Sequence, residues 1–448
     1  MLDAIRWDAR LIQAFDRCGP HYTTYPPSER FEARVGGFDL LRALRDSRQA
    51  QRPLSLQVQL PLCTGETLAR RNRPSYLQCL AHEADLIGCH LGPRQRVEQL
   101  HLGGAPSALD HDALRQLLGH LRQRFALLDD DSGDYGIEID PRVADWPTLG
   151  LLRELGFNRV SIGPQQLGPA RIGPARIGPD EDGPHLAQTR SLIEAARTLH
   201  YRSVNIDLVH GRPGQSPLAF ARTVAALIEL QPDRVSLFDH RDRPARSAPL
   251  QALDDPAASQ AMRQTCIEQL TAAGYRYIGL ELFVLPDDDL AMAQEKGRLR
   301  RGAGGYSAHG HCDLIGLGLG AISQLGDLYT QNCEDPRRYQ ARLAGGQLPV
   351  VRGLHCAADD LVRRAVIETL LCDFELEFRA LETRFGLDFR GYFAAAWPGL
   401  ERLAGEGLID LDEQGIDILP AGRLLVQAVC RLFDRYDAPP CAQAPAPG

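Results

Sequence analysis

The chain has 448 residues and a formal net charge of −8, with 44% hydrophobic and 24% charged residues. This balance is typical of a globular chain with a large core, and the negative charge argues against nucleic acid, which needs a basic face. No run of eighteen apolar residues occurs, and charges are spread through the first fifteen residues. We therefore expect no membrane span, no secretory signal and a cytoplasmic location.

Short apolar segments alternate with helical patterns between about residues 54 and 240. The candidate strands are residues 54–60, 97–103, 135–140, 158–163, 203–211 and 233–240. Such alternation predicts βαβ units and a parallel sheet, hence an α/β fold. Six units fit a partial (β/α)6 TIM-like barrel, in which catalytic groups lie at the carboxyl ends of the strands.

The pattern changes after residue 256 and becomes mostly helical from about residue 355. Residues 408–419, LIDLDEQGIDIL, predict a β-hairpin that turns at DEQG. Helices followed by a hairpin suggest a winged-helix-like module. We predict an N-terminal arm packing on the barrel, the barrel itself, a helical C-terminal domain and a disordered Pro/Ala-rich tail, at residues 1–50, 51–330, 331–436 and 437–448.

A tandem repeat, GPARIGPARIGP, occupies residues 168–179. Proline at every fifth position prevents a helix there. Since the repeat follows a predicted strand, we place it in a loop on the expected active-site face. We interpret it as an expansion in a tolerant surface loop.

Six segments together resemble the oxygen-independent coproporphyrinogen III oxidases, a family of radical SAM enzymes. They are GPHYTTYPPSERF (19–31), PLSLQVQLPLC (53–63), GFNRVSIGPQ (156–165), VNIDLVHGRPGQS (204–216), LPDDDLAMAQEKGRLRRGAGGY (285–306) and DLIGLGLGAIS (313–323). The resemblance runs from about residue 5 to 436. It implies a radical-SAM-type partial barrel, a helical C-terminal domain, a [4Fe–4S] cluster and two S-adenosylmethionine (SAM) molecules. The implied reaction is the oxidative decarboxylation of two propionates of coproporphyrinogen III.

The segment that would hold the cluster departs from the family pattern C-x3-C-x2-C. Cys63 stands at the first ligand position, but Thr67 and Arg70 stand at the other two, and Asn72 replaces a further cysteine. A threonine hydroxyl is a poor substitute for a thiolate, and arginine has no lone pair to offer. The sequence therefore predicts that the cluster is absent and that Cys63 is its vestigial ligand.

No other cysteines are well spaced to replace the missing ligands. The eleven cysteines contain no C-x2-C or C-x3-C pair. Cys79 and Cys89 lie ten residues apart in a helical pattern, and we interpret both as core or half-buried helix residues, since free cysteine packs as a small hydrophobe.

The SAM pocket is partly kept. The resemblance implies SAM contacts at Gly103, Gly104, Glu138, Gln165, Asp207 and Ile322. Against this, Gln57 replaces a tyrosine, the loop at residues 103–106 is one residue shorter than in the family, and the arginine near the second SAM falls in the repeat, at Arg171 or Arg176. From the residues alone, the two acids could instead be strand-end groups held by helix amides. We favour pocket lining, because strand-end acids of barrels usually face the site.

Two groups of residues are potential gains. Arg70, Arg71 and Arg73 could hold tetrapyrrole propionates, although charge runs more often face solvent. The segment 307–312, SAHGHC, places two histidines and a cysteine within six residues. These side chains could bind haem iron or a divalent metal, but the sequence shows no fourth ligand.

Three functions remain open at this point. The first is a degenerate relative without radical chemistry and without assigned catalytic residues, whose role is either to bind a tetrapyrrole, haem or nucleotide-like ligand or to regulate a partner. The second is an active coproporphyrinogen III oxidase with unusual cluster ligation. The third is an interaction protein that uses its C-terminal module. We expect a monomer in each case.

Overall fold

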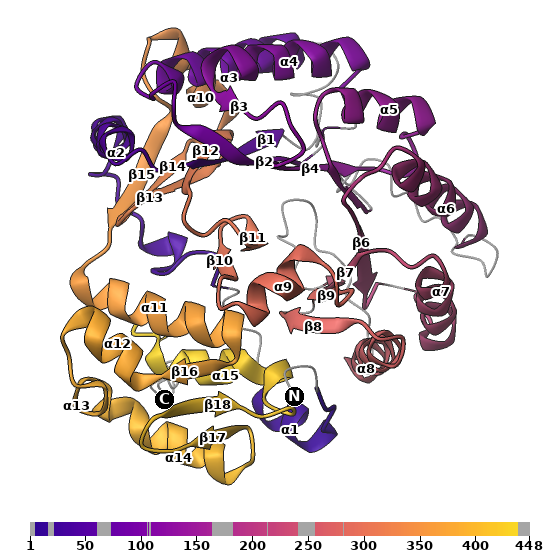
Figure 1. The fold of residues 1–448 in the computed structure, drawn as a ribbon, viewed down its shortest axis with the longest axis vertical. Helices are drawn as coiled ribbons and strands as arrows, with labels where there is room; N and C mark the ends of the chain where they lie inside the picture. The colour runs from indigo at the N-terminus through magenta and orange to yellow at the C-terminus, as the bar shows by residue number, and fades with distance from the viewer. Residues whose placement is uncertain are drawn as a thin grey trace, which may run out of the picture.

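The structure is a computed structural model that describes residues 5–16, 22–60, 73–104, 106, 109–163, 182–212, 214–240, 256–280 and 282–437. Within these ranges, one large mixed sheet runs in the order β15-β14-β13-β12-β1-β2-β4-β5-β6-β7-β9-β8, with β3 (Ala126–Leu127) beside β2. Helices α3 to α8 form an outer arc around the strands (Figure 1). This layered arrangement leaves the concave face of the sheet on the inside.

Six strand–helix units build the arc, and their strands confirm the predicted ones to within one residue at each end. All six strands pair in parallel. The units are β1 (Leu54–Leu60) and α3 (Arg73–Gly88), β2 (Arg96–Gly104) and α4 (His111–Arg124), β4 (Asp134–Ile139) and α5 (Trp146–Glu154), β5 (Arg159–Ile162) and α6 (Asp182–Thr198), β6 (Ser203–His210) and α7 (Pro217–Glu229), and β7 (Arg234–Asp239) and α8 (Pro256–Ala272).

Strand β1 shows why the sequence forms this layer. Leu56 and Val58 are completely buried, whereas Gln57 and Gln59, which point to the other face, are only partly buried. Side chains alternate between the two faces of a strand, so apolar residues pack under the helices and polar ones line the concave face. Each fully buried leucine or valine contributes about 1.5–3 kcal/mol to this packing.

Later strands extend the sheet without closing it. β12 (Asp313–Gly318) pairs in parallel with β1, and β13 (Ile322–Leu325), β14 (Leu328–Asn332) and β15 (Val350–His355) follow in antiparallel order. At the other end, β9 (Leu282–Val284) and β8 (Arg276–Gly279) are antiparallel. The sheet therefore ends at β15 and β8, which agrees with a partial barrel. Smaller elements are η1 (Ser28–Arg30), α9 (Asp289–Glu295), β10 (Arg300–Gly302), β11 (Gly305–Ser307) and α10 (Pro336–Ala344).

The C-terminal region is mostly helical, as predicted. β17 (Ile409–Leu411) and β18 (Gly415–Ile418) form the expected hairpin, and β16 (Glu375–Glu377) adds a third strand. The helices are α11 (Ala358–Asp373), α12 (Phe378–Phe385), α13 (Phe389–Tyr392), α14 (Trp397–Gly405) and α15 (Val426–Cys430), with short 3-10 turns η6 (Ala394–Ala396), η7 (Arg423–Leu425) and η8 (Arg431–Phe433).

The N-terminal segment divides between two parts of the fold. Helix α1 (Ala9–Phe15) lies beside the C-terminal region (Figure 1), where Arg10 Nη1 and Glu406 Oε2 are 2.8 Å apart. Helix α2 (Gly37–Gln49) contacts β13 and β14 at the edge of the sheet. The proposed domain boundaries stay a prediction.

None of the helices in the described ranges combines the length and the apolar character needed to cross a bilayer. The cluster segment 61–72, the repeat at 168–179 and residues 438–448 of the tail lie outside the described residues.

Candidate functional site

A histidine and a glutamate meet on the concave face toward the carboxyl ends of β2 and β4. His101 Nε2 lies 3.3 Å from Glu138 Oε1, and the Gly104 amide donates to Glu138 Oε2 at 3.1 Å. The two side chains keep 37% and 36% of their surface exposed. Both oxygens of the carboxylate thus have partners within the fold, while the pair remains open to the interior of the barrel.

The two glycines beside this pair are required by close packing. A Cβ atom on Gly104, whose φ is +90°, would lie 1.9 Å from the Leu60 carbonyl oxygen. A Cβ atom on Gly103 would lie 3.2 Å from His101 Nε2 and 3.4 Å from Glu138 Oε1. Glycine therefore lets β2 end against β1 and leaves room for the carboxylate.

A second polar network continues along β5, β6 and β7. Asn205 Nδ2 donates to Asp207 Oδ1 at 2.7 Å and to Ser161 Oγ at 2.8 Å. Ser236 Oγ donates to Asn205 Oδ1 at 3.0 Å, which fixes the orientation of the amide. Because Ser161 is the register partner of Glu138, the network adjoins the histidine–glutamate pair.

The charge state of His101 follows from these neighbours. Burial lowers its pKa, but the hydrogen bond and charge of Glu138, with the charges of Asp134 and Asp207, outweigh burial, so the pKa of His101 is raised. The imidazole is therefore protonated to higher pH than an ordinary histidine. When protonated, the imidazole is a cation on a concave face that also carries the Glu138 and Asp207 carboxylates.

The structure brings several predicted residues together at this face. Gly103, Gly104 and Glu138 are in contact, and Asp207 is joined to them through Ser161. Ile322 begins β13, and its backbone closely approaches Gly316, the register partner of Gln57. The roles of these residues in binding SAM stay predictions.

Other predicted residues cannot be placed. Cys63, Thr67, Arg70, Arg71, Asn72, Gln165, Arg171 and Arg176 lie outside the described residues, and the same is true of the side chain of Arg73.

The sequence analysis missed His101, Ser161 and Asn205. Each lies two residues before a residue of the same face, namely Gly103, Gly163 and Asp207. The two-residue period of a strand places such pairs on one face, so polar residues at that spacing before a strand end were an available signal.

The described cysteines lie away from this face. Cys79 is partly buried in α3, as expected, but the prediction for Cys89 is wrong, because Cys89 follows the end of α3 and is exposed. Among the described cysteines, none belongs to strands β1–β7 or to the described residues that directly follow those strands. The others are Cys266, Cys312, Cys333, Cys356, Cys372 and Cys430, and all but Cys312 are buried.

Comparison with known proteins identifies the family. Residues 357–425 match the model of the HemN C-terminal domain. An oxygen-independent coproporphyrinogen III oxidase from Pseudomonas aeruginosa is 53% identical over 452 residues, covering 97% of each chain. The chain belongs to the oxygen-independent coproporphyrinogen III oxidase family. Another family member, from Salmonella typhimurium, is 36% identical over 96% of each chain.

A solved structure of the same family confirms the predicted fold. The coproporphyrinogen III oxidase HemN from Escherichia coli, described as a radical SAM enzyme, is 33% identical. It matches with a TM-score of 0.85 over 97% of this chain and 100% of the other. The mixed α/β architecture with a mostly helical C-terminal region is thus that of the oxygen-independent coproporphyrinogen III oxidases.

Proposed function

We propose that this chain is a coproporphyrinogen III oxidase relative that has given up radical SAM chemistry and retains its barrel to bind a tetrapyrrole. One observation carries the proposal: the segment expected to hold the cluster offers a single thiol, Cys63, with Thr67 and Arg70 at the remaining ligand positions. Three thiolates are needed to hold three irons of a [4Fe–4S] cluster while the fourth iron stays open to SAM.

The position of the described thiols supports the proposal. Among the described cysteines, none belongs to strands β1–β7 or to the described residues that directly follow those strands, so none of them lies beside the start of the cluster segment. Cys63 alone does not fit a cluster that needs three thiolates, and we derive no reaction step through one.

The tetrapyrrole is the ligand class suggested by the relatives, which are named for acting on coproporphyrinogen III. Its propionates accept hydrogen bonds, and the partly exposed His101 imidazole, whose raised pKa favours the protonated form, offers a donor on the concave face. The basic run Arg70, Arg71 and Arg73 adds guanidinium groups, which pair well with carboxylates.

Restoring the ligands tests the loss of the cluster directly. The full chain, purified without oxygen and incubated with iron and sulfide, should hold at most about one iron and no acid-labile sulfide. The double variant Thr67→Cys/Arg70→Cys rebuilds C-x3-C-x2-C and should gain up to about four irons with matching sulfide. Adding Cys63→Ala to the double variant is the matched control and should abolish the gain.

The second candidate is an active coproporphyrinogen III oxidase, favoured by the 53% identity to the Pseudomonas aeruginosa oxidase over nearly the whole chain. About four irons in the unaltered chain, with SAM cleavage on reduction and conversion of coproporphyrinogen III to protoporphyrinogen IX, would establish it and overturn the first proposal.

Tetrapyrrole binding needs a separate measurement. We expect coproporphyrin III to bind the unaltered chain with a shifted Soret band, and His101→Ala to weaken binding. His355→Ala, which changes an exposed histidine paired with Asp39 on another part of the sheet, is the matched control. A Soret band that does not move at saturating protein would contradict tetrapyrrole binding and favour the interaction role.

A further inference from the structure

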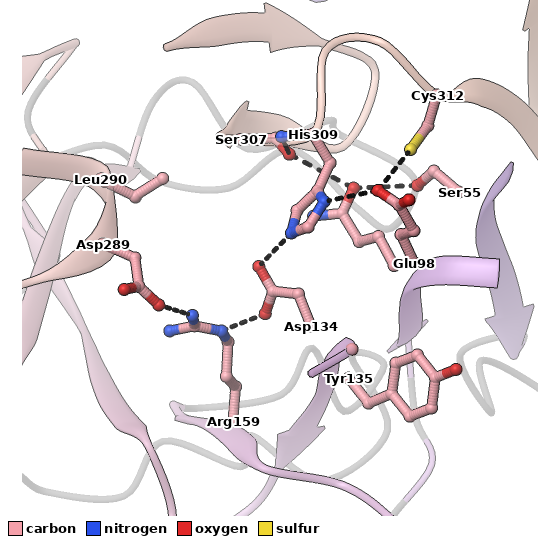
Figure 2. Close-up of polar contacts among 12 residues, drawn as sticks. Ser55, Glu98, Asp134, Tyr135, Arg159, Asp289, Leu290, Ser307, His309 and Cys312 are labelled. Carbon is pink, nitrogen blue, oxygen red and sulfur yellow. Dashed lines mark hydrogen bonds and ion pairs between the residues drawn. The ribbon is translucent and has the colours of Figure 1, made fainter. Parts of the chain in front are cut away.

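Four potential metal ligands meet at the amino end of the barrel, whereas His101 and Glu138 lie toward the carboxyl end. They are His309, His311 and Cys312, which precede β12, and Glu98 near the start of β2. One ligand atom from each lies within 4.8 Å of the other three. Figure 2 shows His309 and Cys312 directed toward the Glu98 carboxylate. We propose that these four side chains form a binding site for a divalent transition metal, with zinc as the best match.

Hydrogen bonds hold the histidine-containing segment in place. The Cys312 amide donates to the His309 carbonyl at 3.0 Å, and the His309 amide donates to Ser307 Oγ at 3.0 Å. Ser307 Oγ in turn donates to Gln99 Oε1 at 3.3 Å. Since Gln99 follows Glu98 on β2, the turn is fastened next to the strand that supplies the fourth ligand.

The spacing of the ligand atoms is close to that of a tetrahedral zinc site. Glu98 Oε2 lies 2.8 Å from His311 Nε2, 3.5 Å from His309 Nδ1 and 3.8 Å from Cys312 Sγ. Zinc bonds of about 2.0–2.3 Å in a tetrahedron place ligand atoms about 3.3–3.8 Å apart. The three distances from Glu98 Oε2 therefore lie within about 0.5 Å of the tetrahedral spacing, and all four ligand atoms lie within 4.8 Å of one another.

A carboxylate supports the histidine from its other side. His309 Nε2 lies 3.6 Å from Asp134 Oδ2, and Asp134 forms an ion pair with Arg159 (Figure 2). His309 Nδ1 is buried and has no hydrogen-bond partner among the described residues. A metal-bound histidine usually donates its second N–H to a carboxylate, which orients the ring and strengthens its lone pair, and Asp134 is the carboxylate placed on that side of His309.

The donor types narrow the metal and its role. Two imidazoles, a thiol and a carboxylate suit zinc, whereas magnesium and calcium prefer oxygen ligands alone. Four protein ligands close a tetrahedral site, which is typical of a structural metal. The ligands His311 and Glu98 are 213 residues apart in sequence, so the metal would tie the segment before β12 to β2.

The experiment uses the full chain after treatment with a chelator. One equivalent of Co²⁺ should produce the absorption bands of a tetrahedral ion with thiolate charge transfer, and Zn²⁺ should displace it and raise the melting temperature. Cys312→Ser should abolish the charge-transfer band, and His311→Ala should weaken zinc binding at least about tenfold. Cys89→Ser and His355→Ala change an exposed cysteine and an exposed histidine elsewhere. These controls should leave the charge-transfer band and the zinc affinity unchanged.

Two results would overturn the proposal. One is the absence of a stoichiometric Co²⁺ spectrum in the unaltered chain, which would leave the four groups as a hydrogen-bonded cluster. The other is zinc affinity in Cys312→Ser and His311→Ala equal to that of the two controls. Melting temperatures measured without metal show whether the variants fold. A stoichiometry of one metal ion per chain, with no acid-labile sulfide, distinguishes this site from an iron–sulfur cluster.

Discussion

The charged side chains at the two ends of the barrel differ in their exposure to solvent. At the amino end, the Arg159 side chain is 10% exposed and forms ion pairs with Asp134 and Asp289. At the carboxyl end, His101 and Glu138 each keep more than a third of their side-chain surface exposed. Arg159 and Asp134, which is 14% exposed, are thus enclosed by the fold, whereas His101 and Glu138 are accessible from the interior of the barrel.

Within one sheet, the buried charges thus contribute to stability, whereas the partly exposed charges are available for binding a ligand. Buried charges depend on their partners, because removal of one partner leaves an uncompensated charge. Partly exposed charges contribute little to stability and stay available to a ligand. In barrels of this kind, conserved architecture at the amino end supports the fold, while the carboxyl end performs chemistry. The proposed zinc ligands are unusual because they lie at the amino end.

The largest expected effect is at the amino end. Arg159→Met should lower the free energy of unfolding by about 3–5 kcal/mol, because it leaves the buried Asp134 carboxylate without its cation, whereas Asp289 keeps its ion pair with Arg202. Urea denaturation of the purified variant measures this loss. Arg115→Met, at an exposed pair with Asp112, is the control and should cost about 0–1 kcal/mol. Equal losses in the two variants would remove the contrast between the ends.

An intermediate effect is expected at Glu83, a buried acid behind the carboxyl end of β12. It accepts hydrogen bonds from the Gly318 amide at 2.9 Å and from Asn332 Nδ2 at 2.6 Å. Burial nevertheless raises the pKa of Glu83 to about 7, from 4.5. The folded protein thus holds this proton more tightly than the unfolded chain does. Stability should fall as pH rises from about 4.5 to about 7, by on the order of 2–3 kcal/mol.

Glu83→Gln sharpens the test, because glutamine does not titrate. The free energy of unfolding of this variant should be flatter over the same pH range than that of the unaltered chain. A slope that survives the substitution would assign the pH dependence to another group.

The smallest effect is expected at the carboxyl end. Glu138→Gln should change the free energy of unfolding by less than about 1 kcal/mol, since the pair is partly exposed. The pKa of His101 should fall, because its main charged partner is removed, and NMR titration of the ring protons measures this. The stability that protonated His101 adds at low pH, which is lost as pH rises through its raised pKa, should shrink accordingly. An unchanged His101 pKa would mean that Asp134 and Asp207 dominate.

Local patterns predicted much of the fold. The strand from Leu54 to Leu60 was located to the residue, because alternating apolar side chains and flanking proline and arginine define it locally. The hairpin at Ile409–Ile418 was likewise evident from its turn. By contrast, the pairing of β12 with β1 depends on residues far apart in the chain, which periodicity cannot reveal.

The candidate sites were harder to predict for the same reason. Glu138 was predicted from the resemblance to the family, but its partner His101 lies 37 residues away on a neighbouring strand and was not predicted. The histidines of the SAHGHC segment were noticed, yet Glu98, the fourth ligand of the proposed site, is more than 200 residues distant. Only the docking of the turn beneath β2 brings them together.

The place of β12 beside β1 also has a consequence for the biogenesis of the protein. During synthesis, one edge of β1 has no partner until Asp313–Gly318 emerge from the ribosome, roughly 250 residues later, on the order of tens of seconds at usual elongation rates. An apolar strand with an open edge is a site for association with other chains. Nascent chains that stop before Asp313 should therefore aggregate or require chaperones, whereas chains that extend past β12 can complete the central sheet.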